Sequence, residues 1–302
     1  GKEEVFSACI KPDDTRYLGG NKSSSVVATK LQGRPRTGIS YDKANEFCAN
    51  RGDWITMIDY LEYCALQALC YIEYANFDNQ ATLNTNLTSD GFKQGGLGDG
   101  VTNLNWEKWT AFNGNNPIVQ TYWTAEHNIG NGSTNGDHYE LGNYNADGSN
   151  LNTYPAVYRG ILNFFGDIWT FIRDVVIINR NANYNSVYLL KKGVNYSDIT
   201  IDNIQDKCYF IGDQTNSNSF ITEFDFRFGP YFIPNKVGTN KKADYNWIRG
   251  SNGQDTDKAV RVLLLGGNAA NGSAAGSSDF NSSWVRPVSS ANIGFFTTVK
   301  LD

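Results

Sequence analysis

The feature that most constrains the fold is a long stretch, from about residue 76 to residue 155, in which Asn, Gly and Thr dominate. Side chains of this kind favour turns and compete with helical hydrogen bonding. The same stretch contains Trp106, Trp109 and Trp123, which is too aromatic a composition for a flexible linker. We therefore expect ordered loops with short strands here, and a chain that folds as a loop-and-strand protein rather than as a helical bundle.

Two helices are predicted before this stretch. Ser40 can cap a short helix that runs through Cys48. A longer helix begins after Thr56 or Asp59, either of which can serve as its cap. Its expected buried face carries apolar residues at the helical spacing i, i+4, i+7, i+8 and i+11, namely Leu61, Ala65, Ala68, Leu69 and Ile72.

The rest of the chain has the pattern of strands joined by turns. An apolar stretch covers 158–178, and short strand-like runs follow at 186–190, 209–211, 220–228 and 231–233. A clear strand covers 259–265, a loop of small residues covers 266–290, and a final strand covers 293–301. No tandem repeat and no Pro/Ser-rich linker divides the chain, so we predict a single α+β domain over residues 1–302.

The five cysteines are widely spread and include no CxxC pair. An odd number argues against a disulfide framework. Cys64 and Cys70 would lie ~9 Å apart along the axis of one helix, which is too far for a disulfide. We expect buried free thiols, with one disulfide as the alternative. Free thiols indicate folding in a reducing compartment such as the cytoplasm.

No general catalytic or metal-binding pattern is present. Only two histidines, His127 and His138, occur, and neither stands in a zinc-binding motif. The nucleophile motif Gly-x-Ser-x-Gly is absent, and so is a P-loop lysine after Gly266 and Gly267. The oxygen-rich stretches 137–147 and 244–257 do not match an EF-hand loop, which leaves a structural or adventitious cation as an open alternative. We predict no catalytic residue, no cofactor and no metal site.

Charge and hydropathy exclude two classes of partner. The net charge is −5 and no basic stripe appears, so we expect no nucleic-acid partner. No segment approaches the length of a membrane-spanning apolar helix, and the first residues lack the apolar core of a signal peptide. We therefore expect no membrane insertion.

The C-terminal segment has the pattern of a displayed binding surface. The strand Arg261–Leu265 leads into two glycines, and a run of small and polar residues follows, with Phe280, Trp284 and Arg286 as isolated large side chains. A rigid scaffold that presents a loop of this composition is how binding surfaces are commonly built. The alternative is an ordinary surface loop.

Several short sequence motifs resemble those of a known protein family. The segment Tyr158–Trp169 closely resembles the central segment of phage tail and variable proteins with a C-type lectin fold, a structural group that includes the formylglycine-generating enzymes. Residues 40–54 and 60–80 resemble the two helices of that group, Asp244–Trp247 resembles its lead-in, and residues 261–295 resemble its variable region. The resemblance covers nearly the whole chain. It implies an α+β C-type lectin fold of the formylglycine-generating-enzyme type, with two helices, short antiparallel strands and long ordered loops.

Several of these residues have scaffold roles in that fold. Gly160 and Gly166 permit tight turns around the central strand. Trp169 and Phe171 would lie on one face of the strand and fill the core. Gly266 and Gly267 let the chain leave its strand sharply.

Some proteins of this group are diversified by retroelements, whose error-prone reverse transcription at adenines changes chosen codons while the scaffold stays constant. The resemblance places the corresponding region at about 261–300. Trp284 and Arg286 would be the anchors of binding, and Asp279 and the serines would supply adaptable polar contacts. The implied ligand-binding positions are Ala270, Asn271, Ala274, Ser277, Ser278, Asp279, Ser283, Trp284, Val285, Arg286 and Phe296.

The resemblance implies a non-enzymatic ligand-binding protein. We expect a retroelement-diversified receptor-binding protein of a phage tail, which determines host tropism, or a similar protein displayed on a bacterial cell surface. Its partner would be a cell-surface protein or glycan of a bacterial host, and a homotrimer is one assembly that stays open. The motifs with which classical lectins bind sugars through calcium are absent.

Two alternatives remain from the sequence. One is an enzyme of the formylglycine-generating type, although those enzymes need a cysteine pair near the C-terminal end and the last cysteine here is Cys208. The other is a structural virion protein without a variable site.

Overall fold

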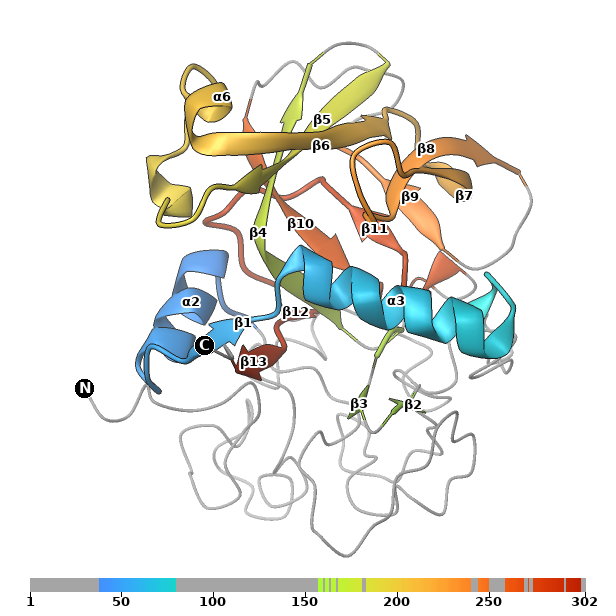
Figure 1. Ribbon diagram of the computed structural model, residues 1–302, viewed down its shortest axis with the longest axis horizontal. Coiled ribbons are helices and arrows are strands. Elements are labelled where there is room, and N and C mark those ends of the chain that lie inside the picture. Colours follow the sequence, from blue (N-terminus) through green and yellow to red (C-terminus); the bar gives the residue numbers. More distant parts are fainter. Residues whose placement is uncertain are drawn as a thin grey trace, which may run out of the picture.

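The computed structural model of the chain is a mixed α+β structure whose main sheet curls into a half-barrel (Figure 1). It describes residues 38–79, 157–159, 161–162, 164–166, 168–180, 183–239, 244–249, 259–268, 271, 274–290 and 292–299. The predicted ordered loops of 76–155 lie almost entirely outside the described residues, as do Gly160, Cys9 and both histidines.

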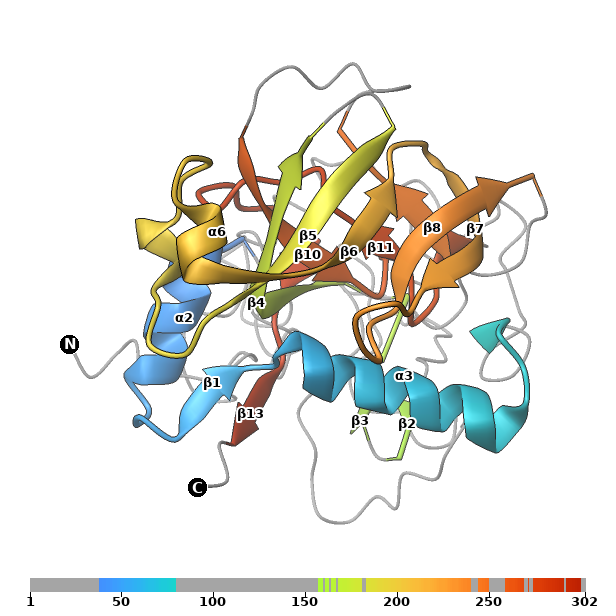
Figure 2. The ribbon, with the colours of Figure 1, turned by 45° about the horizontal axis from the view of Figure 1, so that its top comes forward.

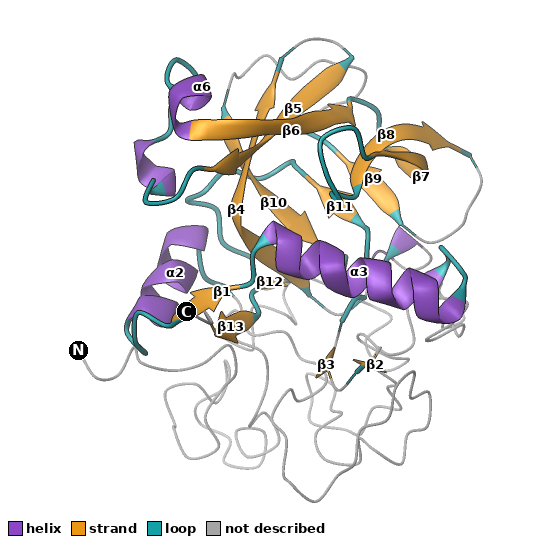
Figure 3. Cartoon of the chain, in the orientation of Figure 1, coloured by secondary structure: helices purple, strands orange, loops and turns teal. Residues whose placement is uncertain are grey.

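The two predicted helices are present, and local capping explains both (Figure 3). Helix α2, Tyr41–Ala49, begins after Ser40, whose side chain accepts a hydrogen bond from the Lys43 amide. Helix α3, Tyr60–Tyr74, begins after Asp59 and not after Thr56. Asp59 and Glu62 form a reciprocal capping box, in which each side chain accepts a hydrogen bond from the other's backbone amide. Among the described helices, none is long and apolar enough to cross a bilayer.

The predicted buried face of α3 is wrong except at Ala68, which is half-buried and packs against a core cluster. Leu61, Leu69 and Ile72 are 50%, 42% and 77% exposed, and Ala65 is exposed as well. The face that packs inward is rotated toward larger or hydrogen-bonding side chains, which bury more area and find partners inside the protein. Its buried members are Tyr60, Tyr63, Cys64, Gln67, Cys70 and Tyr71.

The main sheet is built around one long strand, β4, Trp169–Asn179 (Figure 1). The strand order is β6-β5-β4-β10-β11-β9-β7-β8, and β12 pairs with the start of β4. Its other strands are β5 Tyr184–Leu190, β6 Cys208–Thr215, β7 Ser219–Asp225, β8 Ile233–Gly238, β9 Tyr245–Trp247, β10 Val260–Leu265, β11 Phe280–Asn281 and β12 Ile293–Gly294. The remaining short elements are β1 Ile55–Met57, β2 Val157–Tyr158, β3 Ile161–Leu162, β13 Thr297–Val299, the 3-10 turn η5 Tyr196–Asp198 and α6 Ile204–Lys207.

The sheet curls because its two outermost strands approach each other (Figure 2). Strands β6 and β8 end the strand order on opposite sides and yet contact each other. Gly212 of β6 makes this possible, since a Cβ there would lie only 2.8 Å from Ile233 Cδ1 of β8. Gln214 of β6 also reaches across, with its Nε2 donating to Asn246 Oδ1 of β9 at 2.7 Å.

Strand β4 separates two hydrophobic clusters. Trp169 and Phe171 lie in one cluster, with α2 and β12, which confirms that they share a strand face and fill the core. Ile172, Val175 and Ile177 lie in the other cluster, with α3 and β8. The alternation between faces is interrupted between Ile172 and Val176. The consecutive β10 residues Leu263 and Val262 pair with Ile172 and Val176, so residues 173–175 of β4 have no partner in β10.

The predicted final strand, 293–301, is divided into two strands with different partners. Ile293 and Gly294 pair in parallel with β4, whereas residues 297–299 pair antiparallel with β1. The chain must change partners between them, because β1 lies outside the main sheet. The predicted free thiols are confirmed for the four described cysteines, Cys48, Cys64, Cys70 and Cys208, all of which are buried and unbridged.

The cap of α3 predicts a measurable stability effect. Replacing Asp59 with Ala removes the acceptor for the Glu62 amide and the ion pair with Arg173 at 3.2 Å, so it should lower the free energy of unfolding by about 1–2 kcal/mol. Asp59→Asn keeps a capping acceptor and should cost less. Urea denaturation measures both, with Asp202→Ala on an exposed turn as control. Equal stability of Asp59→Ala and the control would contradict this role.

Candidate ligand-binding site

The C-terminal segment leaves β10 through the two predicted glycines. Gly266 and Gly267 have φ values of 91° and 69°, a region that L-residues with a side chain rarely adopt. A Cβ on Gly267 would lie 2.4 Å from Asp279 Oδ2, so the second glycine is also required by space. The sharp exit from the strand is therefore confirmed, and Gly166, with φ of 81°, takes the turn on the facing segment.

The first half of the segment is buried and not displayed. Ser277, Ser278 and Asp279 are fully buried and Ala274 nearly so, which corrects the expectation that these residues contact a ligand directly. They lie inside because α3 and the residues after it supply hydrogen-bond partners. Gln67 Nε2 donates to the Ser277 carbonyl at 2.8 Å and to Ser278 Oγ at 2.9 Å.

Two buried carboxyl groups organise this base of the segment. Asp244 accepts hydrogen bonds from the Ser278 amide at 2.8 Å and from the Tyr71 hydroxyl at 3.0 Å. Asp279 Oδ1 accepts from Trp247 Nε1 at 2.7 Å, whereas its Oδ2 has no hydrogen-bond partner among the described residues. Both side chains are removed from water, so charge on either is costly.

The burial of this pair shifts both pKa values upward. Desolvation raises the pKa of Asp244 to about 7, and the hydrogen bonds from Ser278 and Tyr71 offset part of the shift. Desolvation, and then the nearby Asp244 carboxylate, raise the pKa of Asp279 well above its usual value. Asp244 also adopts φ of 80°, which fixes its direction toward Ser278.

One feature of the sequence indicates part of this network. Tyr63, Gln67 and Tyr71 stand four residues apart and so share one helix face, and a polar residue between two aromatic ones on such a face indicates a buried hydrogen-bonding stripe. Their partners could not be inferred. Gln67 and Ser278 are 211 residues apart, and Tyr71 and Asp244 are 173 apart.

The second half of the segment, residues 283–286, is partly exposed and is held through its main chain. Arg261 donates to the Ser283 carbonyl at 2.9 Å, and the Val262 amide donates to the Trp284 carbonyl at 3.0 Å. Val285 forms an isolated bridge with Arg261. These contacts tie the backbone of 283–286 to β10 without using the side chains of 283–286.

The two expected anchors are less free than predicted. Trp284 is half-buried and packs on the edge of the core cluster that contains Trp169. Arg286 Nε lies 3.2 Å from Asp42 Oδ2, so its guanidinium is already paired across to α2. Both still present part of their side chain to solvent, beside the half-buried Ser283 and Val285.

Three further predicted positions lie elsewhere or outside the described residues. Phe296 is half-buried on the α3 side, where it lines an apolar hollow of about 460 Å³ with Leu66 and Phe164. It packs on the opposite core cluster from Trp284, so the structure does not bring these two together. Asn271 is partly exposed, and its side chain accepts a hydrogen bond from the Asn268 amide. Ala270 lies outside the described residues.

Comparison with models of known protein families and with curated proteins finds no match for this chain. The described residues also contain no group of three or more His, Cys, Asp or Glu side chains that could hold a metal ion.

The buried carboxyl pair predicts a pH-dependent stability. Because the folded-state pKa of Asp244, about 7, lies above the ordinary value of 3.8, the folded state binds this proton more tightly than the unfolded state does. The contribution of Asp244 is therefore fully present below about pH 4 and is lost as pH rises toward 7, with a slope of at most about 1.4 kcal/mol per pH unit.

Asp244→Asn tests this prediction, because Asn tolerates the same backbone conformation and does not titrate. Denaturant unfolding across this pH range should show a smaller fall for Asp244→Asn than for the parent protein. Asp202→Asn, at an exposed aspartate, serves as control and should keep the parent slope. Parallel curves for all three proteins would show that Asp244 does not carry the effect.

Proposed function

We propose that this chain is a non-enzymatic ligand-binding protein with a C-type lectin fold of the formylglycine-generating-enzyme type, formed by residues 1–302 as one domain. We assign it to the retroelement-diversified receptor-binding proteins of phage tails, which determine host tropism, or to a similar protein displayed on a bacterial surface. The sequence motifs in 158–169, 244–247 and 261–295 support this family assignment, and the α+β half-barrel is compatible with it.

The observation that carries the binding function is the way residues 283–286 are held. Their backbone is fixed by Arg261, Val262 and the bridge to β10, and Val288 closes the turn with its amide on the Val285 carbonyl at 3.1 Å. Side chains on such a backbone can be exchanged without breaking the main-chain hydrogen bonds that fix its shape. A surface that must change its ligand while its scaffold stays constant needs this property.

The binding surface that we propose is therefore smaller than the eleven positions that the resemblance implies. Ser283, Trp284, Val285 and Arg286 form its described part, and the buried Ser277, Ser278 and Asp279 support it from below. A half-buried Trp beside an Arg is the usual composition of an energetic centre of binding. The partner would be a cell-surface protein or glycan of a bacterial host.

The chemistry of the described cysteines favours binding over the formylglycine-type alternative. Cys208 is buried, and desolvation raises the pKa of its thiol to about 11. A thiol in that state is a poor nucleophile at neutral pH. The unbridged state of the four described cysteines supports folding in the cytoplasm before display on the virion.

Substitution of the two anchors should weaken binding to host cells. Trp284→Ala and Arg286→Ala should each reduce affinity by about tenfold or more, since truncation of central aromatic and arginine side chains has effects of this size. Ser283→Arg adds bulk to the same surface without removing core packing and should also reduce binding. Cell-binding assays measure all three.

Trp54→Ala and Arg180→Ala are matched controls at exposed positions, and both should bind normally. Unfolding curves of every variant identify any loss that comes from misfolding. Normal binding by all three variants at 283, 284 and 286 would show that the ligand docks elsewhere.

The gene offers a test of diversification that is independent of any ligand. A reverse transcriptase gene should lie nearby, together with a near-copy of the codons for residues 261–300 that differs mainly at adenines. DNA sequencing of the region checks both. Their absence would reduce the proposal to a lectin-fold binder without a retroelement.

A further inference from the structure

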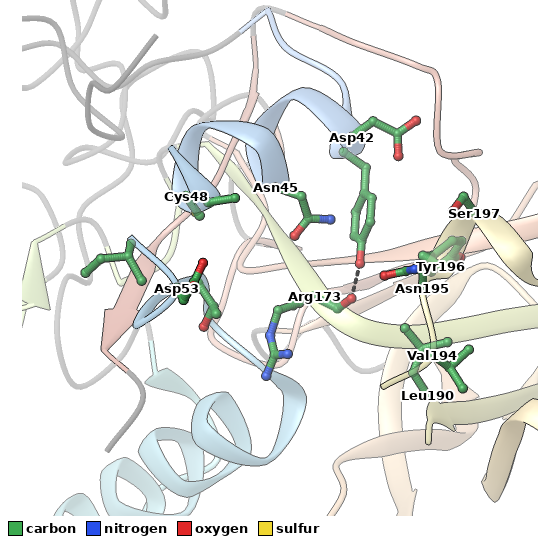
Figure 4. A pocket seen from close by; sticks show the side chains of 14 residues that line it. Asp42, Asn45, Cys48, Asp53, Arg173, Leu190, Val194, Asn195, Tyr196 and Ser197 are labelled. Carbon is green, nitrogen blue, oxygen red and sulfur yellow. Dashed lines mark hydrogen bonds between the residues drawn. The ribbon is translucent and has the colours of Figure 1, made fainter. Parts of the chain in front are cut away.

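A second hollow lies beside α2, and none of residues 283–286 lines it, although its lining residue Asp42 is the ion-pair partner of Arg286. It measures about 600 Å³, which is within the range of small-molecule sites. Helix α2, the loop to β1, strand β4 and the segment around η5 form its walls (Figure 4). Figure 4 shows the side chains of Asn45, Asp53 and Arg173 pointing into it, with Val194, Asn195 and Tyr196 along the facing wall. We call it the α2–η5 pocket.

The interruption of the β4 ladder places Arg173 in this pocket. Arg173 and Asp174 have no ladder partner in β10 or in β5, whereas Val175 pairs with Leu189 of β5, so the Arg173 side chain can turn away from the sheet. The Arg173 amide donates to the Ile58 carbonyl at 3.0 Å, and its carbonyl accepts a hydrogen bond from the Tyr41 hydroxyl. The backbone on both sides of the side chain is thus fixed.

The pocket contains polar atoms that the described residues do not satisfy. Arg173 uses one guanidinium nitrogen on Asp59 at 3.2 Å, while its buried Nε has no hydrogen-bond partner among the described residues. Thr56 is 9% exposed and also lines the pocket, and its hydroxyl likewise has no partner there. A buried donor without a partner is destabilising, so such atoms indicate a place that a ligand or water completes.

The charges of the pocket define the class of ligand. Asp59 already balances Arg173, and Arg286 already balances Asp42. Asp53, at the exposed rim, disfavours an anion, and the Arg173 guanidinium in the wall disfavours a cation. The other polar groups are neutral amides and hydroxyls from Asn45, Asn195, Ser197 and Thr56. Groups of this kind pair best with a ligand whose polar atoms both donate and accept.

We infer that the α2–η5 pocket binds a neutral polyhydroxylated ligand, namely one sugar unit. The sugar hydroxyl oxygens accept hydrogen bonds from Arg173 and from the side-chain amides of Asn45 and Asn195. The sugar hydroxyl groups in turn donate hydrogen bonds to the Asp53 carboxylate. Ile55, Leu190 and Val194 supply the apolar wall on which the carbon face of the ring rests. The inference does not rest on the surface at 283–286, because no residue of that surface lines the pocket.

The test uses the full-length protein and four neutral probes: the methyl glycosides of glucose, galactose, rhamnose and N-acetylglucosamine. Ligand-detected NMR titration at millimolar concentration should show binding of at least one of them. Asp53→Ala and Ser197→Trp should weaken that binding by about tenfold or more, the first by removing an acceptor and the second by filling the mouth. Lys192→Trp, on the same loop but outside the pocket, and Asp202→Ala should bind normally.

Further arms separate the class and source of the ligand. The uronic acid and the amino sugar related to the bound probe should bind more weakly than the neutral sugar, and glycine should not compete. A disaccharide that ends in the same unit identifies the source of the ligand. Tighter binding of the disaccharide than of the monosaccharide indicates the end of a glycan chain, and equal binding indicates a free monosaccharide. Both results support the inference. It is overturned if none of the four probes binds, if Asp53→Ala and Ser197→Trp bind normally, or if a charged analogue or glycine binds best.

Discussion

The arrangement of the molecule depends on the interruption of the long central strand. An uninterrupted β4 would send every second side chain to the same face along its whole length. Because residues 173–175 leave the ladder with β10, Phe171 and Val176 face one core cluster while Ile172 and Val175 face the other. The interruption also positions Asp174 to accept the Tyr60 amide at 2.9 Å, which fixes the first turn of α3 against the sheet. The sheet, the helix and the α2–η5 pocket are therefore set by the same few residues.

The position of α3 in turn determines how the C-terminal segment is supported. With its start held at β4, the helix directs Gln67 and Tyr71 toward the chain that follows Gly267. These side chains, together with Asp244, satisfy main-chain and hydroxyl groups of Ser277 and Ser278 that would otherwise be buried without partners. The segment thus has a polar base fixed by distant residues and an outer part fixed by β10. Only the outer part has side chains whose replacement leaves both sets of contacts intact.

Local features of the sequence predicted the local features of the structure. Ser40 and Asp59 start helices because their side chains accept from amides two or three residues ahead, a contact that needs no knowledge of the fold. The two glycines after Leu265 are equally local, since only glycine adopts both φ values without strain. The buried face of α3 was not predictable in this way. Two stripes of α3 have helical spacing, and the choice between them depended on partners more than 100 residues away, such as Phe164 for Tyr63.

The same limit applies to the buried and exposed serines of the C-terminal segment. A run of small polar residues after a strand has one composition whether its serines face solvent or a buried network, so Ser277 and Ser283 could not be distinguished by type. What separates them is whether the acceptors and donors nearby come from the same segment or from α3. A serine that completes a buried network cannot be exchanged freely, because a larger side chain would displace Gln67 or Asn79 and leave them unsatisfied. A serine such as Ser283, which is held only through its main chain, can be exchanged. Variation that preserves folding is therefore confined by hydrogen bonding to the outer half of the segment, and this limits the size of the binding surface that we propose.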